Sequence, residues 1–174
     1  MSVDRVIEVA LGELGNTEYP PGSNMQKYGA AYGVNGVYWC VQLLWWIFRE
    51  AGESKAFYNG GETASCTTLM QLYKAEGRWH TDGQYQRGDI AIMTFAKNRE
   101  VQHCGLIIGK AEDGGWITVE GNTSPGVEGS QNNGGCVAKK IRFNSNILGV
   151  CRPKYQKEEE PMNDWEHIQW ASKE

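Results

Sequence analysis

The chain has 174 residues, of which 40% are hydrophobic and 22% charged, which fits one globular domain with its own core and excludes wholesale disorder. The formal net charge is −4, and residues 157–174 carry two lysines against six acidic residues, so the first 156 residues are neutral. A neutral body argues against a general nucleic-acid-binding surface, and no apolar run approaches the roughly 18 residues of a membrane span.

The N-terminal segment is predicted to form a helix over residues 2–14, because apolar residues recur on one face and Gly15 follows its end. Charged residues alternate with apolar ones in this segment, which is not the pattern of an export signal. We therefore expect a cytoplasmic protein with no stable membrane insertion. Residues 16–38 are rich in Gly, Pro and Asn, with aromatic residues between them, and predict a long ordered loop of the kind that is usually functional.

Residues 39–52 are apolar almost all round and predict a buried central helix. A third helix is predicted over about 63–76. The second half of the chain changes to short apolar runs separated by Gly and Asn turns, a pattern typical of strands. The predicted strands cover residues 89–95, 101–110, 115–120, 136–143 and 147–151. Helices followed by a strand meander predict an α+β fold with an antiparallel sheet.

The predicted domain covers residues 1–156. Residues 157–174 are acidic, with Trp165 and Trp170 among them, and we interpret them as a tail or the start of a linker.

Five cysteines are present and none forms a CxxC pair, so their spacing predicts neither a disulfide framework nor a structural zinc site. They are Cys40, Cys66, Cys104, Cys136 and Cys151. Without an export signal, we expect these thiols to be reduced.

Cys40 differs from the other cysteines because it lies where the Gly- and Asn-rich loop meets the predicted central helix. A thiol at a helix start is exposed to the positive end of the helix dipole and to unpaired backbone N–H groups, which favour the reactive thiolate. The alternative is a small buried core residue, since free cysteine is among the most buried residue types.

A nucleophilic cysteine needs an imidazole within hydrogen-bond reach. Of the three histidines, His103 lies near the start of a predicted strand, whereas the other two lie in a polar turn and in the tail. Glu120 and Asn122 are two residues apart on the next strand and would share a face. If the two strands pair through the turn at 112–115, a carboxylate and an amide can face the imidazole and fix its orientation. The alternatives are a satisfied core histidine and a local turn around Asn122.

Four motifs in this order resemble the CHAP family, the cysteine, histidine-dependent amidohydrolases and peptidases with a papain-like core. They are YWCVQLLWWIF around Cys40, GDIAIM at 88–93, HCGLIIG at 103–109 and TVEGNTS at 118–124. The resemblance covers roughly residues 5–155. It implies that Cys40 is the nucleophile, His103 the general base and then acid, Glu120 the residue that orients His103, and Asn122 an auxiliary polar group.

The family pattern also has departures in this chain. Cys104 follows His103 where a small apolar residue such as Val is common. The segment 16–38 contains a single carboxylate, Glu18, too few for the six to eight oxygens of a calcium cage. We therefore expect no metal and no cofactor. The oxyanion is expected on the Cys40 N–H and one donor from the preceding loop. The candidates for that donor or for cleft walls are Tyr28, Tyr38, Trp39 and Gln42, and packing is the alternative role for these aromatic residues.

The resemblance implies bacterial peptidoglycan as the substrate, cut either at the muramoyl–L-alanine amide or at a peptide bond of the stem or cross-bridge. It further implies a phage or prophage endolysin, released to the wall with the help of a holin, and we expect a monomer. Two other classes stay open: a non-catalytic wall-binding module on the same scaffold, and a cytosolic thiol peptidase that acts on proteins.

Overall fold

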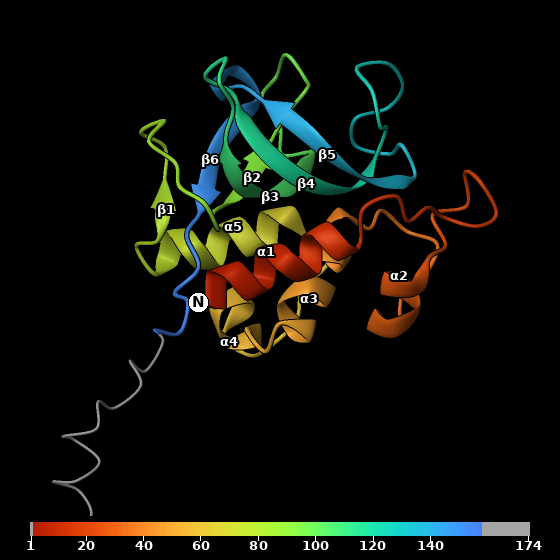
Figure 1. Cartoon of the computed structure of the whole chain (residues 1–174), viewed down its shortest axis with the longest axis horizontal. Helices are drawn as coiled ribbons and strands as arrows, with labels where there is room; N and C mark the ends of the chain where they lie inside the picture. Colours follow the sequence, from red (N-terminus) through yellow and green to blue (C-terminus); the bar gives the residue numbers. More distant parts are fainter. Residues whose placement is uncertain (1, 158–174) are drawn as a thin grey trace, which may run out of the picture.

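The computed structural model describes residues 2–157, which form one layer of helices under one curved sheet (Figure 1). The predicted tail, including Trp165 and Trp170, lies outside the described residues. The helices are α1 (Ser2–Gly12), α2 (Lys27–Tyr32), α3 (Cys40–Glu50), α4 (Ser54–Tyr58) and α5 (Cys66–Ala75), with the short 3₁₀ helix η1 (Asn144–Asn146). Over residues 2–157, no helix combines the length and the apolar character that a bilayer crossing requires.

The sheet contains β1 (Trp79–His80), β2 (Ile90–Met93), β3 (His103–Lys110), β4 (Trp116–Thr123), β5 (Cys136–Arg142) and β6 (Ile147–Cys151). Its strand order is β1-β6-β2-β3-β4-β5, and every pair is antiparallel. This confirms the predicted α+β class with an antiparallel sheet. The strands β3 and β4 pair directly, with Leu106 opposite Val119, so the predicted pairing of the His103 strand with the Glu120 strand is also present.

The central helix α3 packs against β3 and β4 and also contacts α1, α2 and α4. Leu43, Leu44 and Ile47 on α3 are fully buried, as the apolar sequence predicts. One close approach lies at Gly121 of β4, where an added Cβ would lie 2.9 Å from Leu43 and 3.0 Å from the Trp39 ring. A glycine at this point lets the start of α3 lie directly on the sheet.

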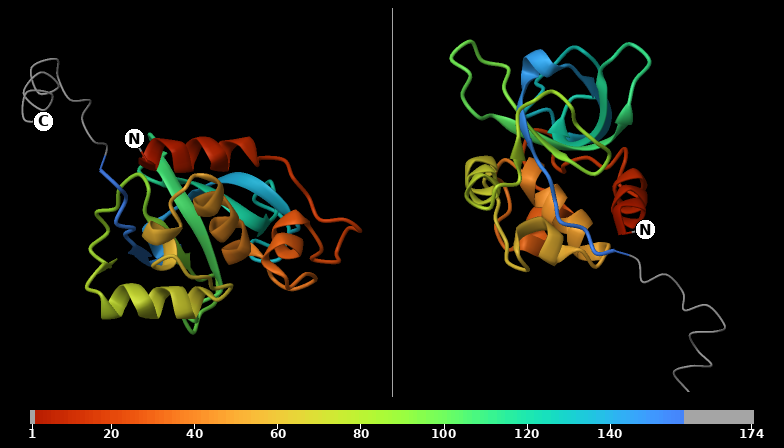
Figure 2. Two further views of the ribbon diagram at one scale, coloured as in Figure 1. Left: turned by 90° about the horizontal axis from the view of Figure 1, so that it is seen from below. Right: turned by 90° about the vertical axis from the view of Figure 1, so that its left-hand side faces the viewer.

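The sheet curves round on itself (Figure 2), and the side chains on its inner face are buried as well. A second, smaller core fills the inside of the curve, and its members are Tyr85, Ala91, Met93, Ile107, Trp116, Ile147 and Val150. Because both faces of the central strands are covered, polar side chains on those strands are cut off from solvent.

Four short elements were not predicted: α2, α4, β1 and η1. The helix α2 lies within the predicted loop 16–38 and has six residues, too few for helical periodicity to be visible. It begins where the Gln26 side chain accepts a hydrogen bond from the Gly29 N–H at 2.8 Å. It is further held by Tyr28, which packs against Trp39 and Trp46.

Candidate active site

Cys40 is the first residue of α3, as predicted. The residue before it, Trp39, makes no side-chain hydrogen bond to the helix start, so the backbone N–H groups there are left for other partners. Cys40 is 7% exposed. A sulfur in this position is stabilised as an anion by the helix dipole, and an oxygen anion bound nearby would be stabilised in the same way.

His103 and Glu120 form a fully buried pair across β3 and β4. The His103 Nε2 atom lies 2.8 Å from Glu120 Oε1, and both side chains are 0% exposed. The other ring nitrogen, Nδ1, has no hydrogen-bond partner among the described residues. The carboxylate therefore fixes the ring through one nitrogen and leaves the second nitrogen for the Cys40 thiol.

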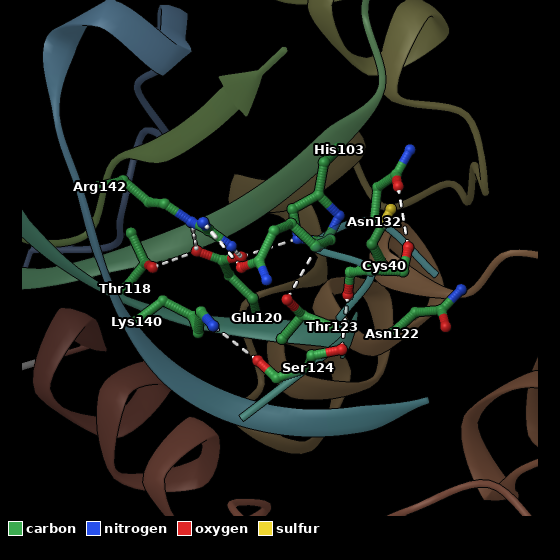
Figure 3. Close-up of polar contacts among 12 residues, drawn as sticks. Cys40, His103, Thr118, Glu120, Asn122, Thr123, Ser124, Asn132, Lys140 and Arg142 are labelled. Carbon is green, nitrogen blue, oxygen red and sulfur yellow. Dashed lines mark hydrogen bonds and ion pairs between the residues drawn. The ribbon is translucent and has the colours of Figure 1, made fainter. Parts of the chain in front are cut away.

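Arg142, at the end of β5, was not predicted as a site residue. It donates two hydrogen bonds to Glu120, from Nε to Oε2 at 2.8 Å and from Nη2 to Oε1 at 2.6 Å. The Thr118 hydroxyl donates to the same carboxylate, so Arg142, Thr118 and His103 surround Glu120 (Figure 3). With its charge balanced in this way, a buried carboxylate can stay ionised and orient an imidazole.

These contacts set the ionisation of the group. Burial opposes ionisation of Glu120, but hydrogen bonds from Arg142 and His103 lower its pKa to about 2. Burial would also lower the pKa of His103, but the neighbouring Cys40 sulfur and the Glu120 carboxylate raise it to about 9. Hydrogen bonds from the Cys104 and Cys66 thiols, together with His103, hold the pKa of Cys40 well below its ordinary range despite burial. The charges therefore favour a thiolate beside an imidazolium.

Asn122 does not share the face of Glu120, and this expectation was wrong. The pairing of β4 with β5 shifts register between Glu120 and Thr123, and Asn122 has a positive φ of 56°. The bulge turns its amide away from the His103 ring (Figure 3). There Asn122 Oδ1 accepts a hydrogen bond from the Gly135 N–H at 3.2 Å, so the side chain ties down the β4–β5 loop.

The four residues proposed to line a cleft or to bind the oxyanion lie in different environments. Tyr28 and Trp39 are buried in the core; the Tyr28 hydroxyl donates to Glu13, and Trp39 Nε1 donates to Glu18. Gln42 is also buried and donates to the Val34 carbonyl.

Because Tyr28 and Trp39 are buried, they cannot line a substrate groove. They pack in the core, which was the alternative role predicted for them. Tyr38, two residues before Cys40, is 61% exposed and is the one member of the four with a side chain open to solvent.

The ion pairs of Glu120 make the acid stability of the chain depend on this residue. Because the pKa of Glu120 is lowered from 4.5 to about 2 in the folded chain, these pairs stabilise the fold fully above pH 4.5. The contribution, about 3 kcal/mol, is lost as the pH falls from about 4.5 to about 2. We expect Glu120→Gln to flatten the dependence of unfolding free energy on pH in this window, measured by urea unfolding at several pH values. An unchanged slope in this variant would contradict the assignment.

The site also contains a group of thiols able to hold a metal ion. Within residues 2–157, the Sγ atoms of Cys40, Cys66 and Cys104 lie within 4.8 Å of one another. The same structure thus brings together a thiol, an imidazole and a carboxylate suited to nucleophilic catalysis, and two further thiols beside the first.

Comparison with known proteins places this geometry in context. The profile of the family described as "CHAP domain" matches residues 32–122, just over half of the chain. No curated protein matches the chain.

Among solved structures, "The crystal structure of Ly7917" has a TM-score of 0.52 at 16% identity, covering 88% of this chain and 63% of that chain. "Crystal structure of a wild type endolysin LysIME-EF1" has a TM-score of 0.50 at 16% identity, covering 88% and 65%. The chain therefore spans less than two thirds of the length of either protein.

Proposed function

The chain belongs to the CHAP family, and from this membership we propose that it is a peptidoglycan hydrolase with Cys40 as its nucleophile. The observation that carries the proposal is the buried His103–Glu120 pair beside a cysteine at an uncapped helix start. The endolysin with a similar fold supports a cell wall as the place of action. Cleavage would occur at an amide bond of the wall, either next to the sugar or within the peptide.

The reaction follows from the charges of the site. The Cys40 thiolate attacks the carbonyl carbon of the amide, and the oxyanion that forms is held by the Cys40 backbone N–H and a second donor from the preceding loop. The imidazolium of His103 then gives its proton to the departing amine nitrogen, which leaves a thioester on Cys40. Water attacks the thioester while His103 accepts the water proton, so the acid is released and the thiolate returns.

The other residues of the site have supporting roles in this proposal. Glu120 keeps the His103 ring in place and stabilises its positive charge, and Arg142 keeps Glu120 ionised. Asn122 holds the loop after β4, and the exposed Tyr38 provides a wall for the sugar–peptide chain. Because Gln42 already donates to the Val34 carbonyl, we assign the second oxyanion donor to a backbone group rather than to this side chain.

The test is hydrolysis of purified bacterial cell walls, followed by turbidity and by mass spectrometry of the released fragments. We expect the wild type to clear the walls and to release free stem peptides or opened cross-links, and Cys40→Ala to do neither. Equal clearing by both proteins would rule out cysteine catalysis. Binding to walls without any released fragment would favour a wall-binding module, and cleavage of casein but not of walls would favour a thiol peptidase that acts on proteins.

A further inference from the structure

Three thiols from distant parts of the chain meet at the start of α3. Cys40 is the first residue of α3, Cys66 the first residue of α5, and Cys104 the second residue of β3. The Sγ atoms of Cys40 and Cys66 are 3.8 Å apart, and all three sulfurs lie within 4.8 Å of one another. The hydrolysis proposed above uses only one of these sulfurs, that of Cys40, as the nucleophile.

The spacing of the sulfurs matches a metal site. Zinc binds cysteine sulfur at about 2.3 Å, usually as one of four tetrahedral ligands, so two sulfurs on the same ion lie about 3.8 Å apart. The sulfurs of Cys40 and Cys66 are 3.8 Å apart. We propose that Cys40, Cys66 and Cys104 together bind one soft divalent cation of the zinc class, with water as its fourth ligand.

The surroundings of the cluster suit such an ion. Thiolates are the ligands that soft cations prefer over carboxylate and carbonyl oxygen. Binding releases the protons of the Cys66 and Cys104 thiols to solvent. Together with the Cys40 thiolate, this leaves three thiolates around a divalent ion, with one net negative charge. Both Cys40 and Cys66 are first residues of helices of ten residues or more, and the positive ends of these helices favour that charge.

Access to the cluster is through Cys66. Cys104 is 0% exposed and Cys40 is 7% exposed, whereas Cys66 is half-buried. A cation can therefore reach the sulfurs from the α5 side while the other two thiols hold it from within. The ion, once bound, occupies the lone pair with which Cys40 would attack an amide. This consequence rests on the proposed function: a soft cation inhibits hydrolysis reversibly and shields the nucleophile from oxidation.

The direct test uses Cd²⁺ as a probe on the reduced full chain. We expect the ultraviolet absorption of thiolate-to-cadmium charge transfer to rise linearly and to stop at one equivalent, and we expect added Zn²⁺ to remove it by competition. In Cys66→Ser, affinity should fall by more than the roughly 10- to 100-fold that loss of an outer-shell partner costs. The matched control is Cys136→Ser, which removes a half-buried thiol outside the cluster and should still bind one equivalent.

Several results would overturn the proposal. They are no absorption at stoichiometric Cd²⁺, equal affinity in wild type and Cys66→Ser, or failure of Zn²⁺ to displace Cd²⁺. Far-ultraviolet circular dichroism of each variant shows whether it is folded, and Cys104→Ala offers a second route to the same loss. This readout does not involve wall hydrolysis, so a chain that binds Cd²⁺ but clears no walls would contradict the proposed function and leave the metal site standing.

Where hydrolysis is observed, inhibition provides a second measurement. Zn²⁺ is expected to inhibit the wild type, with recovery on addition of EDTA, and to inhibit Cys66→Ser much more weakly. Equal inhibition of both proteins would show that zinc acts elsewhere and would contradict the inhibitory consequence.

Discussion

Cys40→Ser is expected to reduce the rate of wall hydrolysis at least about 1,000-fold while leaving the fold intact. The serine hydroxyl has nearly the same size, but the helix start and the His103 imidazole cannot hold it as an anion at neutral pH as they hold the sulfur. The measurement is the initial rate of turbidity loss, with thermal unfolding recorded for the same samples.

The matched control for this prediction is Cys136→Ser. Cys136 donates a hydrogen bond from Sγ to the Thr123 carbonyl at 3.0 Å, and a serine hydroxyl can make the same bond. We expect this variant to keep most of the activity. A Cys40→Ser protein that retains more than a tenth of the wild-type rate would refute the assignment of Cys40 as nucleophile.

Arg142→Met is expected to have the largest effect on stability. The methionine fills a similar volume but leaves the Glu120 carboxylate, which is 0% exposed, without its two strongest donors. Removal of one partner from a buried ion pair costs about 3–5 kcal/mol, which for a chain of this size lowers the melting temperature by about 10 °C. Hydrolysis should fall as well, because a carboxylate without its counter-charge no longer stabilises the His103 imidazolium.

Two control variants show whether the effect comes from the buried contact with Glu120 or from the loss of an arginine at any position. Arg142→Lys keeps the charge but not the two-pronged contact, so its melting temperature should lie between those of the wild type and Arg142→Met. Arg87 pairs with Asp4 on the surface, where an ion pair is worth less than about 1 kcal/mol, and Arg87→Met should melt close to the wild type. Equal melting temperatures for Arg142→Met and Arg87→Met would show that the buried Arg142–Glu120 pair does not stabilise the fold.

The elements with strong periodicity could be predicted from the sequence. The apolar run after residue 39 predicted α3 with Cys40 at its start, and the family motifs predicted which histidine and which carboxylate accompany it. The family match to residues 32–122 confirms the resemblance, and the structure pairs His103 with Glu120. The roles of these residues in catalysis stay predictions.

Arg142 could not be predicted because β5 reverses the usual pattern. Lys140 and Arg142 point inward and are 8% exposed, whereas Ile141 and Phe143 are 49% and 46% exposed. Alternation alone would place the apolar residues inside. The reversal arises from long-range contacts, since Glu120 on β4 and the loop carbonyls of Ser124 and Gly126 attract the two cations, and no local signal encodes them.

Two other features depend on long-range contacts that the sequence pattern does not reveal. The bulge that turns Asn122 depends on the pairing of β4 with β5. Asn122 therefore lies on a different face from Glu120, although the two residues are two positions apart. The thiol cluster joins positions 40, 66 and 104, which are too far apart in the chain for metal-ligand spacing to appear.

The contact at Gly121 has a consequence for how the proposed activity would be lost on heating. Cys40 lies on a helix and His103 on a strand. The distance between thiol and imidazole therefore depends on how closely the helix layer packs on the sheet. That packing depends on the lack of a side chain at Gly121, where Leu43 and Trp39 contact β4. Mild heat or denaturant that separates the helix layer from the sheet would therefore abolish hydrolysis while most of the secondary structure is still intact.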